Sequence, residues 1–462
     1  MVVNHSESDQ VHLLSVTEAA SRIRDGSLKP PEYVEALADR ARRLDPLLRC
    51  IVTLAAETAL ADAQVTEHEI LHGTWRGPLH GIPIGVKDCI ATAGLRTTAN
   101  SRLLIDWVPE KDAPSMAAIR RAGAIVLAKL NLNEFAWSIP SEEDLCPPPR
   151  NPWGPDHLAM GSSSGSAVAV ASGICPAALG TDAGGSVRQP ASNCGVAGLK
   201  PTHGLIDSSG AFGPPSICDV GPIARTVEDV ALLLEGMTGM PGFVDRVKKP
   251  VRGARVGVPR RHIDEARPDP EVAAAFAEAL LGLAQLGMEI VEVEVEGLAD
   301  AAAADFLVLN VEAFAAHREW LRTRIVDYGP SARAYHTQGA FLSATDYTAA
   351  VRVGEVVRHR LEQALAVVDV LATPVVPVVT AEDARASKSR PHTGGTAIFT
   401  APFNLTGHPA ISVPGGMSAA GIPIGLQLAG RLGGDADLLA IACAYQQATP
   451  WHTMRPPLDA AG

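Results

Sequence analysis

The 25 residues between Asp156 and Asp182 include no Asp, Glu, Lys or Arg, and this uncharged stretch constrains the fold more than any other part of the sequence. A membrane-spanning helix needs about 20 predominantly apolar residues. The stretch does not meet this requirement, because serines and glycines fill its beginning from Gly161 to Ser166. It therefore predicts a buried central helix with a polar N-terminus instead of a membrane span.

Apolar runs and segments of helical periodicity alternate along most of the chain. The first helix is expected to begin at a cap provided by Ser15 or Thr17. Further helices are predicted at 31–44, 55–71, 115–123, 166–172, 227–237 and 271–286. Strands are predicted at 81–87, 124–128, 254–259, 288–295, 367–372 and 411–413, whereas 151–160 is expected to be a loop. The alternation is typical of an α/β fold with a central, mostly mixed β-sheet covered by helices on both faces.

No internal repeat or low-complexity tract divides the chain, so we expect one domain spanning 1–462. Its catalytic core is expected at about 75–235. Gly, Pro and basic residues gather at 239–255, which makes this segment the best candidate for a linker.

The charge and the cysteines exclude several classes of protein. Lys and Arg number 39 against 51 Asp and Glu, and the formal charge of −12 argues against binding to nucleic acid or to anionic membranes. Seven widely spaced cysteines are not typical of a disulfide framework. Residues 1–10 are polar and lack the pattern of a secretory signal, so the cytoplasm is the expected location.

Two short motifs suggest hydrolytic chemistry, but neither has the context that it requires. The segment from His68 to His72 matches HExxH, the zinc-binding helix of metalloproteases, yet no third ligand follows and Gly73 ends the helix. The segment 161–165 matches GxSxG, but the nucleophile elbow of α/β-hydrolases needs a strand directly before it. We therefore expect no metal site at the histidines, and a zinc-dependent hydrolase remains the less favoured alternative.

A third pattern is spread over the chain. Lys87 ends the predicted strand 81–87, Ser162 follows 75 residues later, and Ser186 follows after another 24 in a second glycine-rich loop. With these positions and further segments, the chain resembles the amidase signature family over nearly its whole length. The further segments are Asn131–Phe135, Arg150–Trp153, Cys194–Leu205, Phe399–Gly407, Ile411–Pro414 and Gly425–Leu428.

The resemblance implies the amidase signature fold and an amide-bond hydrolase that uses a Ser–cis-Ser–Lys triad and an acyl-enzyme, with no metal or cofactor. Ser186 corresponds to the nucleophile, Ser162 to a bridging serine beside a cis peptide bond, and Lys87 to the terminal base. Because an ammonium group cannot accept a proton, Lys87 must be neutral during the attack, and burial would favour that form. The resemblance also implies an oxyanion hole made by the N–H groups of Ala183, Gly184, Gly185 and Ser186. By the same resemblance, Asp182 and Arg188 brace the loop network behind the catalytic residues, and the small side chain of Ser163 allows the tight geometry beside Ser162.

The substrate is less well specified than the chemistry. Candidate walls of a pocket for a small-molecule amide are Phe135, Trp137, Ile139, Phe306, Phe314 and Trp320. Met160 and Ser164 stand where the family usually has glycine, so they are expected to affect the shape of the pocket.

The main alternative is the glutaminase subunit of a tRNA-dependent amidotransferase. That subunit usually has an Asp before its Pro-x-Asn-Leu segment, where the stretch 397–402 has Ala, although Arg358 fits one of its basic positions. A non-catalytic binding module and a homodimer also remain open.

Overall fold

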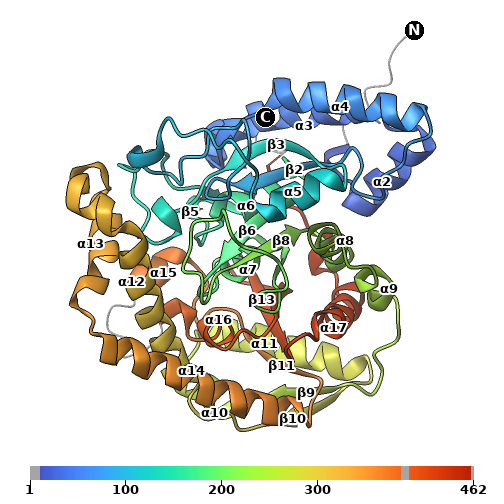
Figure 1. Ribbon diagram of the computed structural model, residues 1–462. Helices are drawn as coiled ribbons and strands as arrows, with labels where there is room; N and C mark the ends of the chain where they lie inside the picture. The colour runs from blue at the N-terminus through green and yellow to red at the C-terminus, as the bar shows by residue number, and fades with distance from the viewer. Residues whose placement is uncertain (1–10, 387–394, 459–462) are drawn as a thin grey trace.

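Eleven of the strands in the part of the chain that the computed structural model describes, residues 11–386 and 395–458, form one mixed sheet (Figure 1). The strand order is β1-β3-β2-β6-β8-β7-β12-β13-β11-β9-β10. The strands are β1 (Ile51–Leu54), β2 (Pro83–Lys87), β3 (Ile125–Leu130), β6 (Ala177–Asp182), β7 (Ala197–Lys200), β8 (Asp219–Ala224), β9 (Arg255–Val258), β10 (Glu289–Glu292), β11 (Val370–Pro374), β12 (Ala410–Met417) and β13 (Pro423–Gly430).

The centre of the sheet is parallel where the candidate site begins. Strand β2 pairs in parallel with both β3 and β6, and β6 pairs antiparallel with β8. Every residue of β2, β3, β6 and β8 is buried, which explains why apolar and polar residues do not alternate along these strands. Because β2 and β6 are parallel neighbours, their carboxyl ends, at Lys87 and Asp182, lie at the same edge of the sheet.

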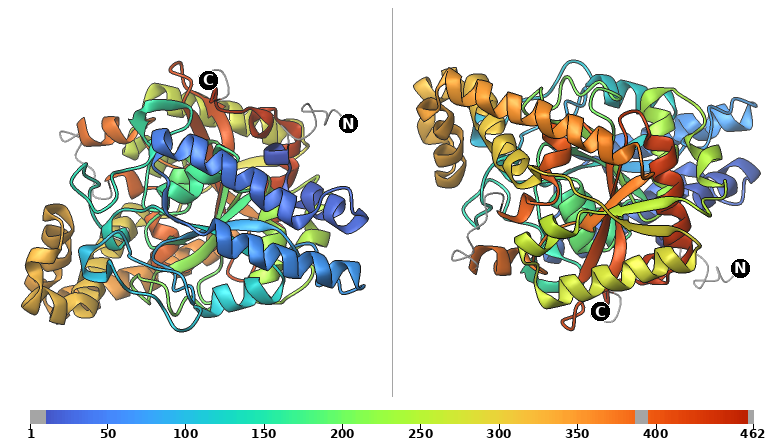
Figure 2. Two further views of the ribbon diagram at one scale, coloured as in Figure 1. Left: turned by 90° about the horizontal axis from the view of Figure 1, so that it is seen from above. Right: turned by 90° about the horizontal axis from the view of Figure 1, so that it is seen from below.

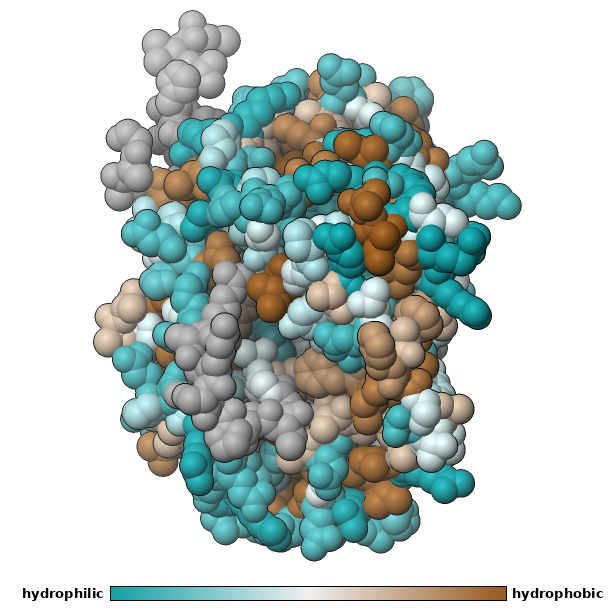
Figure 3. Space-filling view, turned by 90° about the vertical axis from the view of Figure 1, so that its left-hand side faces the viewer, coloured by the Kyte–Doolittle hydropathy of each residue, from teal (hydrophilic) through white to brown (hydrophobic). Residues whose placement is uncertain are grey.

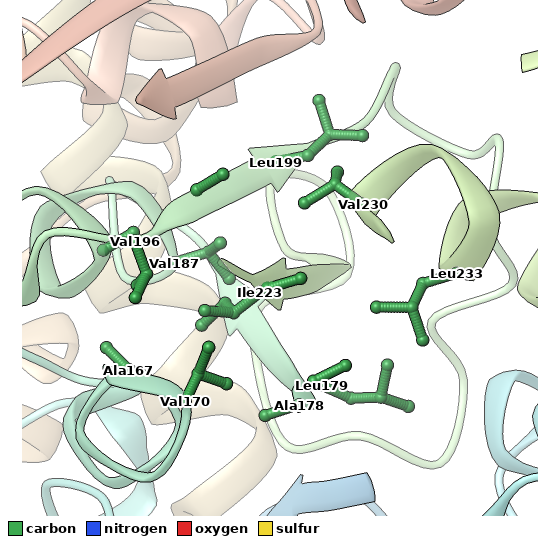
Figure 4. Packing of buried hydrophobic residues seen from close by; sticks show 14 of the residues in the cluster. Ala167, Val170, Ala178, Leu179, Val187, Val196, Leu199, Ile223, Val230 and Leu233 are labelled. Atoms are coloured by element: carbon green, nitrogen blue, oxygen red, sulfur yellow. The ribbon is translucent and has the colours of Figure 1, made fainter. Parts of the chain in front are cut away.

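Helices cover both faces of the sheet, as the α/β pattern predicts. Figure 4 shows Ala167 and Val170 of α6 on one side of strands β6, β7 and β8, and Val230 and Leu233 of α8 on the other. The longer helices are α2 (Val16–Asp25), α3 (Pro30–Leu48), α4 (Ala56–Leu71), α5 (Pro114–Arg121), α6 (Ser164–Ala171), α8 (Val227–Thr238), α11 (Pro270–Gln285), α12 (Leu298–Thr323), α13 (Pro330–Thr337), α14 (Ala344–Leu365) and α17 (Asp435–Ala448). The shorter helices are α7 (Arg188–Cys194), α9 (Phe243–Val247), α10 (Arg260–Ala266), α15 (Ala381–Ala386) and α16 (Ala401–Leu405).

Helices α12, α13 and α14 extend to one side of the sheet, as both views of Figure 2 show. The single-turn helices η4 (Ile325–Asp327) and η5 (Gln338–Phe341) connect them. Figure 3 presents this side of the molecule, where hydrophobic residues are interspersed with hydrophilic ones around a recess.

The uncharged stretch becomes the centre of the fold. Helix α6 begins at Ser164, and each of its eight residues is buried. The prediction of a buried central helix is therefore confirmed. No helix in the described ranges has the length and hydrophobicity that crossing a bilayer requires. The N-terminal decapeptide, on which the expectation of no secretory signal depends, lies outside the described residues.

Local rules explain where the first helix begins. The Ser15 hydroxyl accepts a hydrogen bond from the Glu18 N–H, and the Glu18 carboxylate accepts one from the Ser15 N–H, which together form a capping box. Of the two predicted caps, Ser15 is thus the one used. Gly26 ends the helix in the left-handed conformation, with φ of 80°.

Two segments differ from what the sequence indicates. The expected loop at 151–160 contains the hairpin of β4 (Arg150–Asn151) and β5 (Gly154–Leu158). Most residues of these two strands are only partly buried, so no alternation of apolar and polar residues marks them in the sequence. The candidate linker 239–255 contains α9, whose Phe243 and Val247 are buried in the core. Strands from both sides of this segment belong to the same sheet.

Candidate active site

Lys87 is the last residue of β2, and its side chain is completely buried. Its Nζ donates hydrogen bonds of 2.8 Å to Ser162 Oγ and 2.8 Å to Thr181 Oγ1. No carboxylate forms an ion pair with it among the described residues. Burial lowers the pKa of Lys87, because the ammonium form loses its solvation and is not compensated by a paired negative charge.

Ser162 lies in the turn that leads into α6, and the Gly161–Ser162 peptide bond is cis. Its side chain is nearly buried but lines the main cavity together with Gly161. The contact with Lys87 brings together two of the three predicted triad residues, which are 75 positions apart in the chain.

Ser186 is partly exposed and lines the same cavity as Ser162. Its carbonyl oxygen accepts a hydrogen bond of 3.0 Å from the Ser163 N–H, which connects its loop to the turn before α6. The Ser186 hydroxyl forms no hydrogen bond with Ser162 in the part of the chain that the structure describes. The structure therefore places the two serines at one cavity, with no hydrogen-bond partner for the Ser186 hydroxyl among the residues that it describes.

Ser163 connects these segments through buried contacts. Its hydroxyl donates to the Thr181 carbonyl at 3.1 Å and accepts from the Thr181 N–H at 3.2 Å. Ser163 is the central serine of the GxSxG match, and it is buried and does not line the cavity, so its position gives no support to the nucleophile elbow that the sequence already disfavours. Ser163 thus connects β6 to the turn before α6 from behind the cavity wall.

Asp182 and Arg188 form a completely buried ion pair below the Ser186 loop. The Arg188 guanidinium donates to both carboxylate oxygens, at 3.0 Å through Nε and 2.9 Å through Nη2. Burial by itself would raise the pKa of Asp182, but the charge of Arg188 and the hydrogen bonds outweigh it and hold this pKa well below its usual range. Arg188 also donates to the carbonyl of Thr400 and to the side chains of Asn404 and Gln427.

The predicted oxyanion hole needs one correction. The Gly185 N–H donates to Asp182 Oδ1 at 2.7 Å and is therefore not available to a substrate. Gly185 has φ of 125°, and a β-carbon there would overlap Thr400, so only glycine fits. Ala183, Gly184 and Ser186 line the cavity, and their N–H groups have no hydrogen-bond partner among the described residues. These three donors are the ones that remain for an oxyanion.

The cavity has a volume of about 440 Å³ and a largely apolar wall. The predicted wall residues Phe135, Trp137, Ile139 and Phe306 line it, whereas Phe314 and Trp320 pack against the core instead. Further lining residues are Met160, Thr181, Glu312, His317, His336 and Ala397.

The two departures from the family pattern have different effects. Met160 lines the cavity and packs against Val375, Val376 and Val378, so its side chain occupies space that a glycine would leave open. Ser164 is buried as the first residue of α6 and does not reach the cavity.

Several residues at the site were not foreseen from the sequence. Thr181 contacts Lys87 only because β6 lies beside β2. Asp305 of α12 is buried next to Gly184, and neither of its carboxylate oxygens has a hydrogen-bond partner among the described residues. Burial, reinforced by the charge of Asp182, raises the pKa of Asp305 well above its usual value. The signal available in the sequence was a single acidic residue within the otherwise apolar segment Ala301–Leu309.

The HExxH segment lies at the end of α4 and outside the cavity. The rings of His68 and His72 stack with centroids 4.0 Å apart, and the carboxylate of Glu69 forms an ion pair with Arg76 and a 3.0 Å hydrogen bond with His80 Nε2. Within the described residues, no group of three His, Cys, Asp or Glu side chains has the arrangement of a metal site. Both oxygens of Glu69 are thus engaged, one by Arg76 and the other by His80.

Comparison with known proteins gives one consistent family. The model of the family described as Amidase matches residues 32–439. A relative from Roseiflexus sp. (strain RS-1), named as a subunit of glutamyl-tRNA(Gln) amidotransferase, is 37% identical over 484 residues, which cover 97% of this chain and 99% of the relative. A protein of the same name from Geobacter sp. (strain M21) is 35% identical, with 96% and 99% covered.

Solved structures agree with the sequence comparison. A structure described as an amidase superimposes with a TM-score of 0.85 at 32% identity, covering 94% of this chain and 99% of that one. A 6-aminohexanoate cyclic dimer hydrolase complexed with substrate gives a TM-score of 0.86 at 26% identity, with 97% and 99% covered. With a mixed α/β sheet of this topology and a family match over most of its length, the chain belongs to the amidase signature family and is an amidase-type carbon–nitrogen hydrolase.

Proposed function

We propose that the protein hydrolyses neutral small-molecule amides through an acyl-enzyme on Ser186, with Ser162 as proton relay and Lys87 as base. The observation that carries this proposal is the buried 2.8 Å hydrogen bond between Lys87 and Ser162 at the edge of the cavity that Ser186 lines. A serine hydroxyl needs a positioned proton acceptor to become a nucleophile. A lysine in the neutral form, which burial favours, can supply that acceptor through Ser162.

The reaction then proceeds in balanced steps. As Ser186 Oγ attacks the substrate carbonyl, its proton passes to Ser162, and the Ser162 proton passes to the Lys87 amine. The N–H groups of Ala183, Gly184 and Ser186 stabilise the oxyanion that forms. The network returns a proton to the leaving nitrogen, the C–N bond breaks, and an ester to Ser186 remains. Water attacks this ester and gives up a proton to the same network, the bond between the acyl carbon and Ser186 Oγ breaks, and the network returns the proton to Ser186 as the acid leaves.

The composition of the cavity supports a neutral substrate. Among its described lining residues there is no Lys or Arg to pair with a substrate carboxylate. The only acidic lining residue in the described part, Glu312, already accepts hydrogen bonds from the Tyr347 hydroxyl and the Ser216 N–H. An uncompensated charge in such a cavity is costly, so an uncharged amide is favoured.

A second candidate function is the glutaminase subunit of a tRNA-dependent amidotransferase, in complex with other subunits. The names of the relatives that are 35–37% identical to this chain favour it. The site argues against it, since Ala397 lines the cavity within the stretch where that subunit usually has Asp. Arg358 donates to the Thr406 carbonyl at 2.9 Å and does not line the cavity.

One preparation of the enzyme tests both functions. Purified protein is assayed for ammonia release from glutamine and for hydrolysis of a panel of neutral amides, hydrazides, esters and ureas. Mass spectrometry after treatment with a fluorophosphonate probe locates the nucleophile. We expect the label on Ser186 and turnover of neutral amides above that of glutamine. A label at another residue, or glutamine as the preferred substrate, would refute the proposal.

A further inference from the structure

Two histidines lie side by side in the wall of the cavity, on helices that the triad does not involve. His317 belongs to α12 and His336 to α13, and their ring centroids are 4.3 Å apart. Phe135 packs edge-on against His317 at 4.4 Å. All three residues line the cavity, and neither histidine has a role in the proposed reaction.

The hydrogen bonds determine which nitrogen of His336 carries the proton. Its Nδ1 lies 2.9 Å from the Ala332 carbonyl oxygen, which can only accept a hydrogen bond. Nδ1 is therefore the protonated nitrogen. Burial lowers the pKa of His336 to about 4, so the ring is neutral at neutral pH and its Nε2 carries a lone pair.

His317 has the opposite tautomer. Its Nδ1 lies 2.7 Å from the hydroxyl of Tyr328, and burial raises the pKa of this tyrosine, which keeps its proton. The phenol has no other hydrogen-bond partner among the described residues, so it donates to Nδ1. Burial and the nearby His336 lower the pKa of His317, and the neutral ring then carries its proton on Nε2.

Both Nε2 atoms remain available to a ligand. Neither forms a hydrogen bond with a described residue, and neither is sealed from solvent. Both residues line the cavity and their ring centroids are 4.3 Å apart, so the two neighbouring rings can offer a ligand one N–H donor and one nitrogen acceptor. A carboxylate offers only acceptors and an ammonium group only donors, so neither matches this pair.

Resting on the proposed function, we infer that His317 and His336 bind a second, neutral carboxamide-type group of the substrate, distant from the bond that is cleaved. The matching groups are a primary carboxamide, a lactam or a urea. In these groups N–H and C=O lie on the same edge. The N–H of the ligand faces the acceptor nitrogen of His336, and its C=O faces the N–H donor of His317. An N-alkylated trans amide separates its donor and acceptor and fits only one of the two rings.

A series of substrates with one constant scissile amide tests the inference. Diamides of the four-, six- and eight-carbon diacids are compared with the methyl ester, N-methylamide and carboxylate at the distal end, and with the plain alkanamide. We expect kcat/KM for the best diamide to exceed that of its methyl ester about fivefold and that of the alkanamide by more, since each ordinary hydrogen bond is worth roughly that factor. Equal values for diamide and alkanamide would overturn the inference.

Matched variants assign the effect to the two rings. His336→Asn keeps a donor for the Ala332 carbonyl but removes the acceptor, whereas His336→Gln places an amide oxygen near the former Nε2. We expect the diamide preference to fall in His336→Asn and to be restored in part in His336→Gln. His317→Asn and His317→Gln form the corresponding pair for the donor. Unchanged preference in both Asn variants would contradict the inference.

Binding separates this inference from the proposed function. Calorimetry with Ser186→Ala protein measures adipamide and heptanamide directly, without turnover. Tighter binding of adipamide supports the subsite even if no member of the series is hydrolysed, an outcome that would refute only the proposed function. Equal binding, or no binding of adipamide, overturns the subsite whatever the activity.

Discussion

Replacing Asp182 by Asn tests whether the buried ion pair holds the Ser186 loop together. Three hydrogen-bond donors converge on each carboxylate oxygen: on Oδ1 from Gly185, Arg188 and Asn404, and on Oδ2 from Val187 and twice from Arg188. An Asn side chain keeps only one oxygen, so three donors lose their acceptor in either orientation. The guanidinium of Arg188 is then left buried without its counter-charge.

The expected cost follows from this arrangement. Removing one partner of a buried, hydrogen-bonded pair destabilises a protein by about 3–5 kcal/mol. Urea denaturation followed by circular dichroism measures the change in the free energy of unfolding. The control is Asp437→Asn, which breaks the exposed 2.7 Å pair with Arg246 and should cost under about 1 kcal/mol. Equal losses for Asp182→Asn and Asp437→Asn would show that the buried pair does not stabilise the loop.

Three further predictions concern single residues of the site. Lys87→Ala should lower acylation about 10²–10⁴-fold and flatten the alkaline rise of the pH–rate profile, because a lowered lysine pKa makes the neutral base more abundant as pH increases. A retained alkaline limb would exclude Lys87 as the base. For Asp305, the folded pKa lies above the unfolded value near 4, so the wild type loses stability as pH rises from that value to the folded pKa. In this window, urea denaturation at several pH values should show the free energy of unfolding of Asp305→Asn rising relative to that of the wild type by about 1.4 kcal/mol per pH unit. A difference between the two proteins that does not change with pH would contradict a protonated Asp305. Gly185→Ala should lower kcat about 10²–10³-fold by displacing the oxyanion loop against Thr400. Gly204→Ala, at a similarly left-handed position with open space around it, should leave kcat unchanged, and equal losses would mean that strain elsewhere is responsible.

Hydrophobic periodicity predicted helices and strands well where burial against the sheet determines the pattern of the segment. The helix predicted at 271–286 is α11, Pro270–Gln285, and the strand predicted at 81–87 is β2, Pro83–Lys87. Their apolar patterns reflect burial against the sheet, which is what periodicity measures. The hairpin at β4 and β5 and the short helix α9 were missed, since loop-like composition hides elements that contribute few buried side chains.

The sequence predicts the parts of the candidate site that depend on which residue stands at which position. It does not predict the contacts that depend on which strands are neighbours or on how a loop turns. Lys87, Ser162 and Ser186 stand at recognisable positions of the family pattern. The contact of Thr181 with Lys87 depends on the parallel neighbourhood of β2 and β6. The use of the Gly185 N–H by Asp182 depends on the turn of the loop, which no residue pattern specifies.

The relay through Ser162 is the central claim, and the rate of acyl-enzyme formation in Ser162→Ala measures it most directly. Rapid-quench mass spectrometry follows the acylation of Ser186 in the wild type and in the variant, with circular dichroism as the control for folding. We expect acylation to fall about 10²–10⁴-fold, because the proton of Ser186 no longer reaches the buried amine of Lys87. A folded Ser162→Ala enzyme that acylates at the wild-type rate would contradict the account.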